Sequence, residues 1–298
     1  MNVTLRQLRV FRSVVATRNF SRTGELVGLT QPAVSRAIGE LESALGLRLL
    51  DRTTREVELT EAGRSLAGRL ERALDEVDSM LADVAGLAST DRGKVRIASS
   101  PTPSAYLMPD CIAACTREAP RVRVVLIDRL QRDVLESVRS GEVDFGVVVE
   151  PPSTDDLHCE TILRDPFVLV VPAAHRFAQK ASTRWKALDG ASLVLTDSAS
   201  GSRRYIDDAL ARYGAACTVE QELGHPTTVL RMVAAGIGVS VLPALGVPAQ
   251  ETLGLAVRPL LPRVERAVML ARRADRALSP VAARVWTLIA KTVSPHAR

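Results

Sequence analysis

The segment Thr30-Gln-Pro-Ala-Val-Ser-Arg36 constrains the fold most, because it combines a helix start with a polar outer face. Thr30 is a residue type that caps helices, and Pro32 stands in the first turn, where its missing N–H costs nothing. Apolar residues follow at helical spacing: Val34, Ile38, Leu41 and Leu45. The other face carries Gln31, Ser35, Arg36 and Gly39. Because Gln and Arg make bidentate hydrogen bonds to base edges, the pattern predicts a helix that enters the major groove of DNA.

Charge is unevenly distributed along the chain. Residues 1–60 hold nine Arg, no Lys and six acidic residues, a net of +3, whereas residues 61–91 have a net of −4. A basic surface beside a reading helix is what nucleic-acid binding needs. A net of +3 is also ordinary for a small domain, so charge alone does not decide between DNA binding and a solvated surface.

Residues 1–60 are predicted to form three helices and a two-stranded wing, which is a winged helix-turn-helix domain. Ser21 is expected to cap the second helix, with Phe20 ahead of it as a hydrophobic staple. Gly46 is expected to end the third helix. The first helix has an apolar face of Leu5, Leu8, Phe11 and Val15. The wing is expected as strands 47–50 and 57–59 with the polar loop Asp51-Arg-Thr-Thr-Arg55 between them.

A heptad pattern occupies residues 61–91. Apolar residues are spaced alternately four and three apart: Leu66, Leu70, Ala73, Val77, Met80, Val84 and Leu87. A period of 3.5 sustained over three heptads is typical of a coiled coil and predicts a dimer. The alternative is one amphipathic helix that packs on its own domain.

Strands alternate with helices in residues 92–298, which indicates α/β units around mainly parallel sheets. Strands are expected at 95–98, 122–127, 143–149, 167–171, 193–195, 239–242 and 268–271. Helices are expected at 104–118, 131–140, 203–213, 227–235 and 280–292. Gly236-Ile-Gly238 lies between a helix and a strand, the wrong order for a dinucleotide-binding loop, and is interpreted as a turn.

Composition argues against several protein classes. The chain has no secretory signal and no apolar run of about 18 residues, so a cytoplasmic protein with no membrane partner is expected. Four scattered cysteines do not make a disulfide framework. They are interpreted as core residues, with a thiol switch or metal site as the alternative: Cys111, Cys115, Cys159 (beside His158) and Cys217.

Residues 4–64 resemble the DNA-binding domain of LysR-type transcriptional regulators. The matching residues recur at fixed spacing: Leu8, Phe11, Phe20-Ser21, Leu26, Thr30 to Arg36, Ile38, Leu41-Glu42, Leu45-Gly46, Leu49, Arg52, Leu59-Thr60 and Gly63. Residues 233–243 are similar to a late segment of the family's effector domain. The chain departs from the family at Thr23-Gly24, usually paired Ala, and at Asp51, usually Phe.

The resemblance implies an all-α winged helix-turn-helix domain, a long coiled-coil linker helix, and an α/β effector domain with two lobes, like a periplasmic binding protein. The expected domains are 1–60, 61–91 and 92–298, with lobe I at about 92–163 and 268–298 and lobe II at about 164–267. The resemblance also implies DNA-binding residues: Gln31, Pro32, Ser35 and Arg36 in the groove, and Arg52, Thr53 and Arg55 in the wing.

The family's effector site lies in the cleft between lobes, at strand ends and helix starts. Here the first strand runs into a series of hydroxyl-bearing residues at a helix start, which suits an anion. The choice among Ser99, Ser100 and Thr102 stays open, and Ser104 is interpreted as an ordinary cap. The resemblance adds Gln131, Thr196, Arg203, His225 and Thr227.

Aromatic residues are only 3% of the chain, so an aromatic-walled pocket is not expected and the effector is predicted to be a small organic acid or another polar anion. Arg203 or His225 is expected to supply the counter-charge, although Arg203 is equally consistent with a solvated position in the first turn of its helix.

By this resemblance the chain is expected to be a transcription regulator, not an enzyme, with no cofactor and a small-molecule co-inducer. Expected partners are double-stranded DNA carrying an inverted repeat, RNA polymerase and a second copy of the chain, bound through the linker helix. Two such dimers are expected to form a homotetramer, and the protein is expected to act at the bacterial nucleoid. A ligand that closes the cleft is expected to change the spacing of the DNA-binding domains. A cytosolic solute-binding protein and an enzyme using the cleft are the competing interpretations, and neither needs a basic reading helix.

Overall fold

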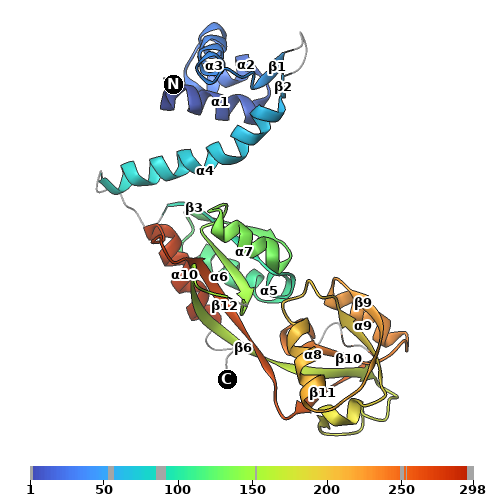
Figure 1. Ribbon diagram of the computed structural model, residues 1–298. Coiled ribbons are helices and arrows are strands. Elements are labelled where there is room, and N and C mark those ends of the chain that lie inside the picture. The colour runs from blue at the N-terminus through green and yellow to red at the C-terminus, as the bar shows by residue number, and fades with distance from the viewer. Residues whose placement is uncertain are drawn as a thin grey trace. The chain divides into compact units, whose positions relative to one another are not determined.

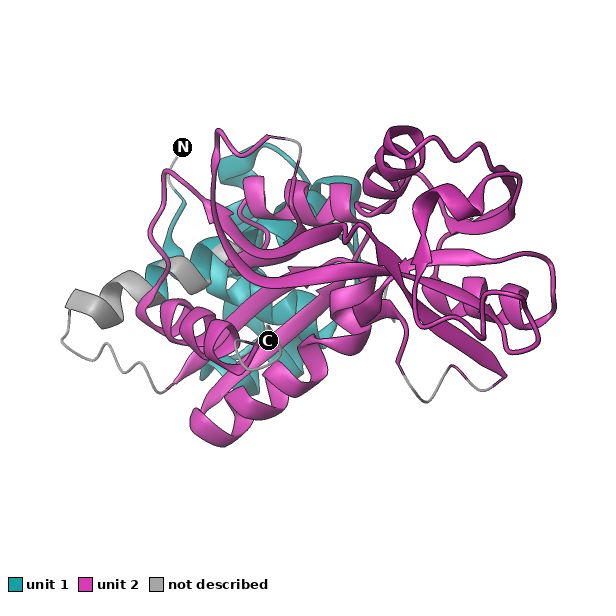
Figure 2. Cartoon of the chain, turned by 90° about the horizontal axis from the view of Figure 1, so that it is seen from below, with its two compact units in different colours: residues 1–88 teal, residues 89–298 magenta. Residues whose placement is uncertain are grey.

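The computed structural model describes residues 3–52, 57–84, 92–151, 153–248, 252 and 254–293. The chain divides into two compact units, residues 1–88 and 89–298, which Figure 2 colours separately. Hydrophobic clusters form separately within each unit. Within the described ranges, no helix is long and apolar enough to span a membrane.

The first unit is helical with a small two-stranded sheet. Its elements are α1 (Leu5–Thr17), α2 (Phe20–Val27), α3 (Gln31–Leu45), β1 (Leu50–Arg52), β2 (Val57–Leu59) and α4 (Glu61–Val84). Pro32 lies in the first turn of α3, and Gly46 ends that helix with a φ of 68°, which confirms both predictions. Thr30 holds the N-cap position, but its side chain makes no capping hydrogen bond.

The start of α2 differs from the prediction. This helix begins at Phe20, one residue before Ser21, because the side chain of Asn19 caps it by accepting a hydrogen bond from the Arg22 N–H at 3.0 Å. Asn is as good an N-cap residue as Ser, and the sequence offered both.

The first wing strand also differs, since it covers Leu50–Arg52 instead of 47–50. The Glu42 carboxylate accepts hydrogen bonds from the N–H groups of Leu49 and Leu50 at 2.8 and 3.1 Å. The Thr60 hydroxyl donates to the carbonyl of Arg48 at 2.7 Å. These contacts occupy the backbone ahead of Leu50, so the ladder with β2 begins there.

Helix α4 packs its first half on its own unit. Leu70 and Leu74 are buried in the core formed with α1 and α3, and Leu66 packs against the same cluster. Leu74 is not a position of the heptad seam, so the alternative of an amphipathic helix packed on its own domain holds for this half. Ala73 is exposed and Val77 is partly exposed. The seam side chains of Met80 and Val84, and all of Leu87, lie outside the described residues.

The second unit contains a central sheet in the order β4-β3-β5-β12-β6-β11-β7, with β10 also paired to β6, and a separate β8-β9 pair. Its strands are β3 (Gly93–Ser99), β4 (Val122–Asp128), β5 (Phe145–Val149), β6 (Leu157–Pro172), β7 (Thr183–Arg184), β8 (Ser192–Thr196), β9 (Thr218–Leu223), β10 (Ser240–Pro243), β11 (Leu255–Leu261) and β12 (Glu265–Arg273). Its helices are α5 (Pro101–Tyr106), α6 (Met108–Glu118), α7 (Gln131–Arg139), η1 (Trp185–Leu188), α8 (Arg203–Arg212), α9 (Pro226–Ala234), η2 (Ala244–Gly246) and α10 (Pro280–Val293).

Two lobes share the long strands β6 and β12 (Figure 1). The first lobe packs β3, β4, β5, α5, α6, α7 and α10 around buried residues such as Ile97, Phe145 and Ile289. The second lobe packs β7 to β11, α8 and α9 around residues such as Trp185 and Ile206. Because each lobe closes its own core, the shared strands are the connection between them.

The prediction of mainly parallel sheets is wrong for this unit. β3 pairs in parallel with β4 and β5, and β8 with β9. However, β12 is antiparallel to β5 and β6, and β6 is antiparallel to β10 and β11. The antiparallel pairs arise because β6 carries the chain from the first lobe to the second and β12 brings it back.

The helix expected at 104–118 is in fact two helices. The chain breaks at Leu107, whose φ and ψ are −120° and −48°. Pro109 lies in the first turn of α6 and has no N–H to continue a helix from α5. Ser104 is not a cap, since its hydroxyl donates to the Ser99 carbonyl at 3.1 Å. The strands β7, β9 and β11 and the first half of β6 were not expected from the sequence.

Candidate functional site

A cavity of about 30 Å³ lies between the two lobes of the second unit, where β3, β5, β8 and β10 end. The first lobe contributes residues after β3 and β5 and at the start of α7: Ser100, Pro101, Thr102, Leu130, Gln131 and Val149. The second lobe contributes Thr196, Asp197, the loop 199–202, Gly224, Pro226 and Pro243, and β12 contributes Arg266. Four residues predicted from the sequence therefore meet here: Ser100, Thr102, Gln131 and Thr196.

Two hydroxyl groups of this cavity lack hydrogen-bond partners among the described residues. Ser100 Oγ and Thr196 Oγ1 are both buried without a partner, and each residue is only 4% exposed. A buried hydroxyl without a partner costs about 1–3 kcal/mol. A polar ligand in the cavity would recover that cost.

Arg266 supplies a buried positive charge at the cavity wall. It is 2% exposed, and its Nε and Nη2 donate to Asp165 Oδ2 at 2.9 and 2.8 Å. Its Nη1 donates to the Ser202 hydroxyl at 2.5 Å. Burial lowers the pKa of Arg266, and the adjacent Asp165 carboxylate opposes that effect. A guanidinium has five N–H groups, so donors remain for an anion.

Three helices start at this cavity without a side-chain cap. The N-cap residues of α7, α8 and α9 make no capping hydrogen bond through their side chains. Gln131, Ser202 and Pro226, at or beside these helix starts, line the cavity. First-turn N–H groups lack intrahelical acceptors and carry partial positive charge, which favours an oxyanion, whereas Asp197 adds a carboxylate to the same wall.

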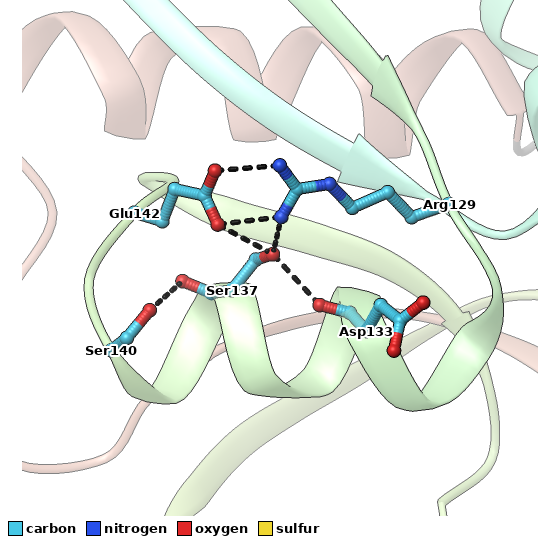
Figure 3. Close-up of polar contacts among 5 residues, drawn as sticks. All are labelled: Arg129, Asp133, Ser137, Ser140 and Glu142. Carbon is cyan, nitrogen blue, oxygen red and sulfur yellow. Dashed lines mark hydrogen bonds and ion pairs between the residues drawn. The ribbon is translucent and has the colours of Figure 1, made fainter. Parts of the chain in front are cut away.

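A polar cluster fixes the start of α7 (Figure 3). The Arg129 guanidinium donates to both carboxylate oxygens of Glu142 at 2.6 and 2.7 Å and to the Ser137 hydroxyl at 2.6 Å. Ser137 in turn donates to the Asp133 carbonyl at 2.7 Å. Gln131 lies two residues after Arg129, and its Oε1 accepts from the Val149 N–H at 2.9 Å. The cluster therefore holds the cavity side of α7 in a defined orientation.

The other four predicted effector residues do not line the cavity. Arg203 pairs with Asp207 at 2.9 Å and Glu222 at 2.8 Å and lies outside the cavity lining. Ser99 is fully buried and its hydroxyl donates to the Ser100 carbonyl. His225 and Thr227 are exposed and also lie outside the cavity lining. Arg266, not Arg203 or His225, is the cation of the cavity, and the only trace of it in the sequence is an Arg ahead of the apolar run 267–271.

The predicted reading face of α3 is on the surface of the first unit. Gln31, Pro32 and Arg36 are exposed and Ser35 is partly exposed. The opposite face of the same helix is completely buried at Val34, Ile38 and Leu41. The wing residues Thr53 and Arg55, and the side chain of Arg52, lie outside the described residues.

Comparison with known proteins assigns both units. A model of the bacterial regulatory helix-turn-helix protein of the lysR family matches residues 5–64, and a model of the LysR substrate binding domain matches residues 88–294. The chain belongs to the LysR family of transcriptional regulators. Its relative YfeR of Shigella flexneri, an HTH-type transcriptional regulator, is 51% identical over 97% of this chain and 94% of its own.

Solved structures show that LysR regulators share this fold. An OxyR mutant of Corynebacterium glutamicum matches 99% of this chain and 94% of its own, with a TM-score of 0.74 at 24% identity. The effector binding domain of QuiR in complex with shikimate matches 69% of this chain and 99% of its own, with a TM-score of 0.63 at 16% identity. The family assignment makes this LysR chain a DNA-binding regulator with an effector-binding domain, not an enzyme.

The four cysteines of this LysR regulator are buried or partly buried. Cys111 and Cys115 are each 1% exposed, and burial raises the pKa of Cys111 to about 12. Burial also raises the pKa values of Cys115, Cys159 and Cys217. Core packing is therefore confirmed for the first two. The described part of the chain contains no group of three residues able to hold a metal ion.

Proposed function

We propose that this LysR regulator reads DNA with α3, which presents Gln31, Pro32, Ser35 and Arg36 to base edges in the major groove. The support is the exposed polar face opposite a fully buried stripe. Arg52, Thr53 and Arg55 of the wing are proposed to contact phosphate or the minor groove. DNA binding is proposed to take place at the nucleoid in the cytoplasm.

The active form is proposed to be an assembly of several copies. Two copies pair through the outward face of α4, where Ala73 and Val77 are accessible, and their reading helices meet two halves of an inverted repeat. Two such pairs form a tetramer through their effector units, and RNA polymerase is the further partner. The domain division proposed for these roles is 1–60, 61–91 and 92–298.

The effector is proposed to be a small organic acid held in the cavity between the lobes. The observation that carries this is the pair of unpartnered hydroxyls, Ser100 Oγ and Thr196 Oγ1, in a cavity that also holds Arg266. Thr102 and Gln131 complete its polar wall. QuiR binds shikimate, a carboxylate with several hydroxyl groups, so hydroxylated acids are the first class to test.

Calorimetry of the full chain against small carboxylates and their neutral amides tests this proposal. Hydroxylated carboxylates are expected to bind, and Thr196→Val is expected to weaken them at least about tenfold by removing a hydrogen bond to a charged ligand. Thr183→Val is the matched control, because Thr183 also has a buried hydroxyl without a partner but does not line the cavity. Binding of amides but not carboxylates would contradict the proposal.

A further inference from the structure

Side chains of the two lobes meet directly beside the effector cavity. Glu150 follows β5 of the first lobe, and Arg204 and Tyr205 lie in the first turn of α8 in the second. The Tyr205 hydroxyl donates to Glu150 Oε2 at 2.8 Å, and Arg204 Nη2 donates to the Glu150 carbonyl at 2.7 Å and to the Tyr205 hydroxyl at 3.0 Å. The Arg204 guanidinium also lies 4.7 Å from the centre of the Tyr205 ring. Glu150 thus accepts from two adjacent residues across the gap, through its carboxylate from Tyr205 and through its backbone carbonyl from Arg204.

The loop before α8 also lies directly on the first lobe. A Cβ at Gly201 would lie 2.6 Å from Cδ of Gln131, closer than real Cβ atoms approach a neighbour. The φ of Gly201 is not in the positive range, so what limits a side chain here is contact with the end of the Gln131 side chain and not the backbone conformation. Elsewhere between the lobes, the Tyr106 hydroxyl of the first lobe lies 3.4 Å from Thr227 Oγ1 of the second.

These contacts leave a cavity too small for an organic acid. The cavity volume of about 30 Å³ is about a tenth of that of the smallest usual pockets for small molecules. The lobes must therefore separate before an effector enters.

We infer that Glu150, Arg204 and Tyr205 form a latch that holds the two lobes together, and that this latch must break for an effector to enter the cavity. The inference rests on the proposed effector role of the cavity. Because only the open fraction of molecules binds, the latch lowers the apparent effector affinity by that fraction. Variants that weaken the latch open the cleft without any ligand.

Hydrogen–deuterium exchange on the full chain, with no ligand added, tests the latch. Tyr205→Phe removes the hydroxyl and keeps the ring, so exchange at the Val149 amide and in the loop 199–203 is expected to become about fivefold faster. Gly201→Ala is expected to act in the same direction, because its Cβ pushes the loop off Gln131. Exchange in the core strand β3 should stay as in the wild type.

Tyr213→Phe is the matched control, because Tyr213 is the C-cap residue of the same helix and also lies beside an arginine. The Arg212 guanidinium is 5.7 Å from the centre of the Tyr213 ring, and that ring contacts Trp185 of its own lobe. This variant should leave cavity exchange unchanged. Wild-type exchange at Val149 and 199–203 in both Tyr205→Phe and Gly201→Ala would overturn the latch. That result would leave the carboxylate calorimetry untouched, whereas a failure of the calorimetry would remove the effector site while the exchange result stood.

Discussion

Gly63 shows how one residue joins the wing of the first unit to α4. A Cβ at this position would lie 3.0 Å from the carbonyl carbon of Leu49 and still closer to its oxygen. Gly63→Ala is therefore expected to lower the free energy of unfolding of the first unit by about 1–3 kcal/mol, the usual cost of overpacking. Urea denaturation followed by circular dichroism measures this. Gly68→Ala in the same helix, where a Cβ meets nothing within 4 Å, should be neutral or stabilising.

The Asp165–Arg266 pair is the residue-scale feature on which the second unit depends most. Both side chains are 2% exposed, and Asp165 Oδ1 also accepts from the Leu245 N–H at 2.9 Å. Asp165→Ala leaves a buried unpaired guanidinium and is expected to cost about 3–5 kcal/mol of unfolding free energy. Arg266→Met combined with Asp165→Leu should recover most of that loss. If Asp165→Ala lowers the free energy of unfolding no more than an exposed substitution such as Asp207→Ala, the buried pair does not stabilise the second unit.

The thiol chemistry of the chain follows from burial. A pKa near 12 instead of 9.0 lowers the thiolate fraction of Cys111 at pH 8 by about a thousandfold. Cys111 is therefore expected to resist iodoacetamide in the native protein and to react in urea. Mass spectrometry of the labelled peptides measures both rates. Native labelling of Cys111 at the rate of a free thiol would contradict this account and reopen a redox role.

At the scale of elements, one face of α4 packs in the core of the first unit, and the other is the proposed surface for pairing with a second copy. Leu74 is 1% exposed in the core of the first unit, whereas Val77 is partly exposed. Leu74→Ala is expected to cost about 2–5 kcal/mol of unfolding free energy, because it opens a cavity. Val77→Asp is expected instead to raise the dimer dissociation constant at least about tenfold, because a charge would enter the paired surface. Sedimentation and thermal unfolding separate the two effects, and a Val77→Asp protein that still sediments as wild type would refute pairing through this face.

The positions of the helices and strands in the sequence were largely predictable, but which elements pack or pair with one another was not. The periodicity around Val34, Ile38 and Leu41 placed α3 correctly, because a buried stripe leaves a 3.6-residue period. A heptad and an amphipathic helix packed on its own domain share nearly the same pattern, so the burial of Leu74 was not visible in the sequence. The β6–β12 crossing was missed because it depends on pairing over about a hundred residues, such as Asp165 with Arg266.

The residues of the candidate site were likewise only partly predictable from the sequence. Gln131 and Thr196 were expected from the family resemblance, while the choice among Ser99, Ser100 and Thr102 was open; Ser100 and Thr102 line one cavity with Gln131 and Thr196. Arg203 was misjudged, because no sequence rule showed that Asp207 and Glu222 would both bind it. Arg266 was missed because a single charged residue in a strand does not reveal which loops approach it.

At the scale of the whole molecule, the chain joins a DNA-binding unit to an effector-binding unit. The proposed base reading by α3 can be measured by footprinting and gel-shift titration on DNA upstream of the chain's own gene. Arg36→Ala is expected to weaken specific binding by about 1–3 kcal/mol and to relax preference at one base position. Arg132→Ala removes the same charge from a side chain that is 89% exposed in the effector unit, and should leave the footprint intact. An Arg36→Ala protein with the wild-type footprint and affinity would contradict the claim.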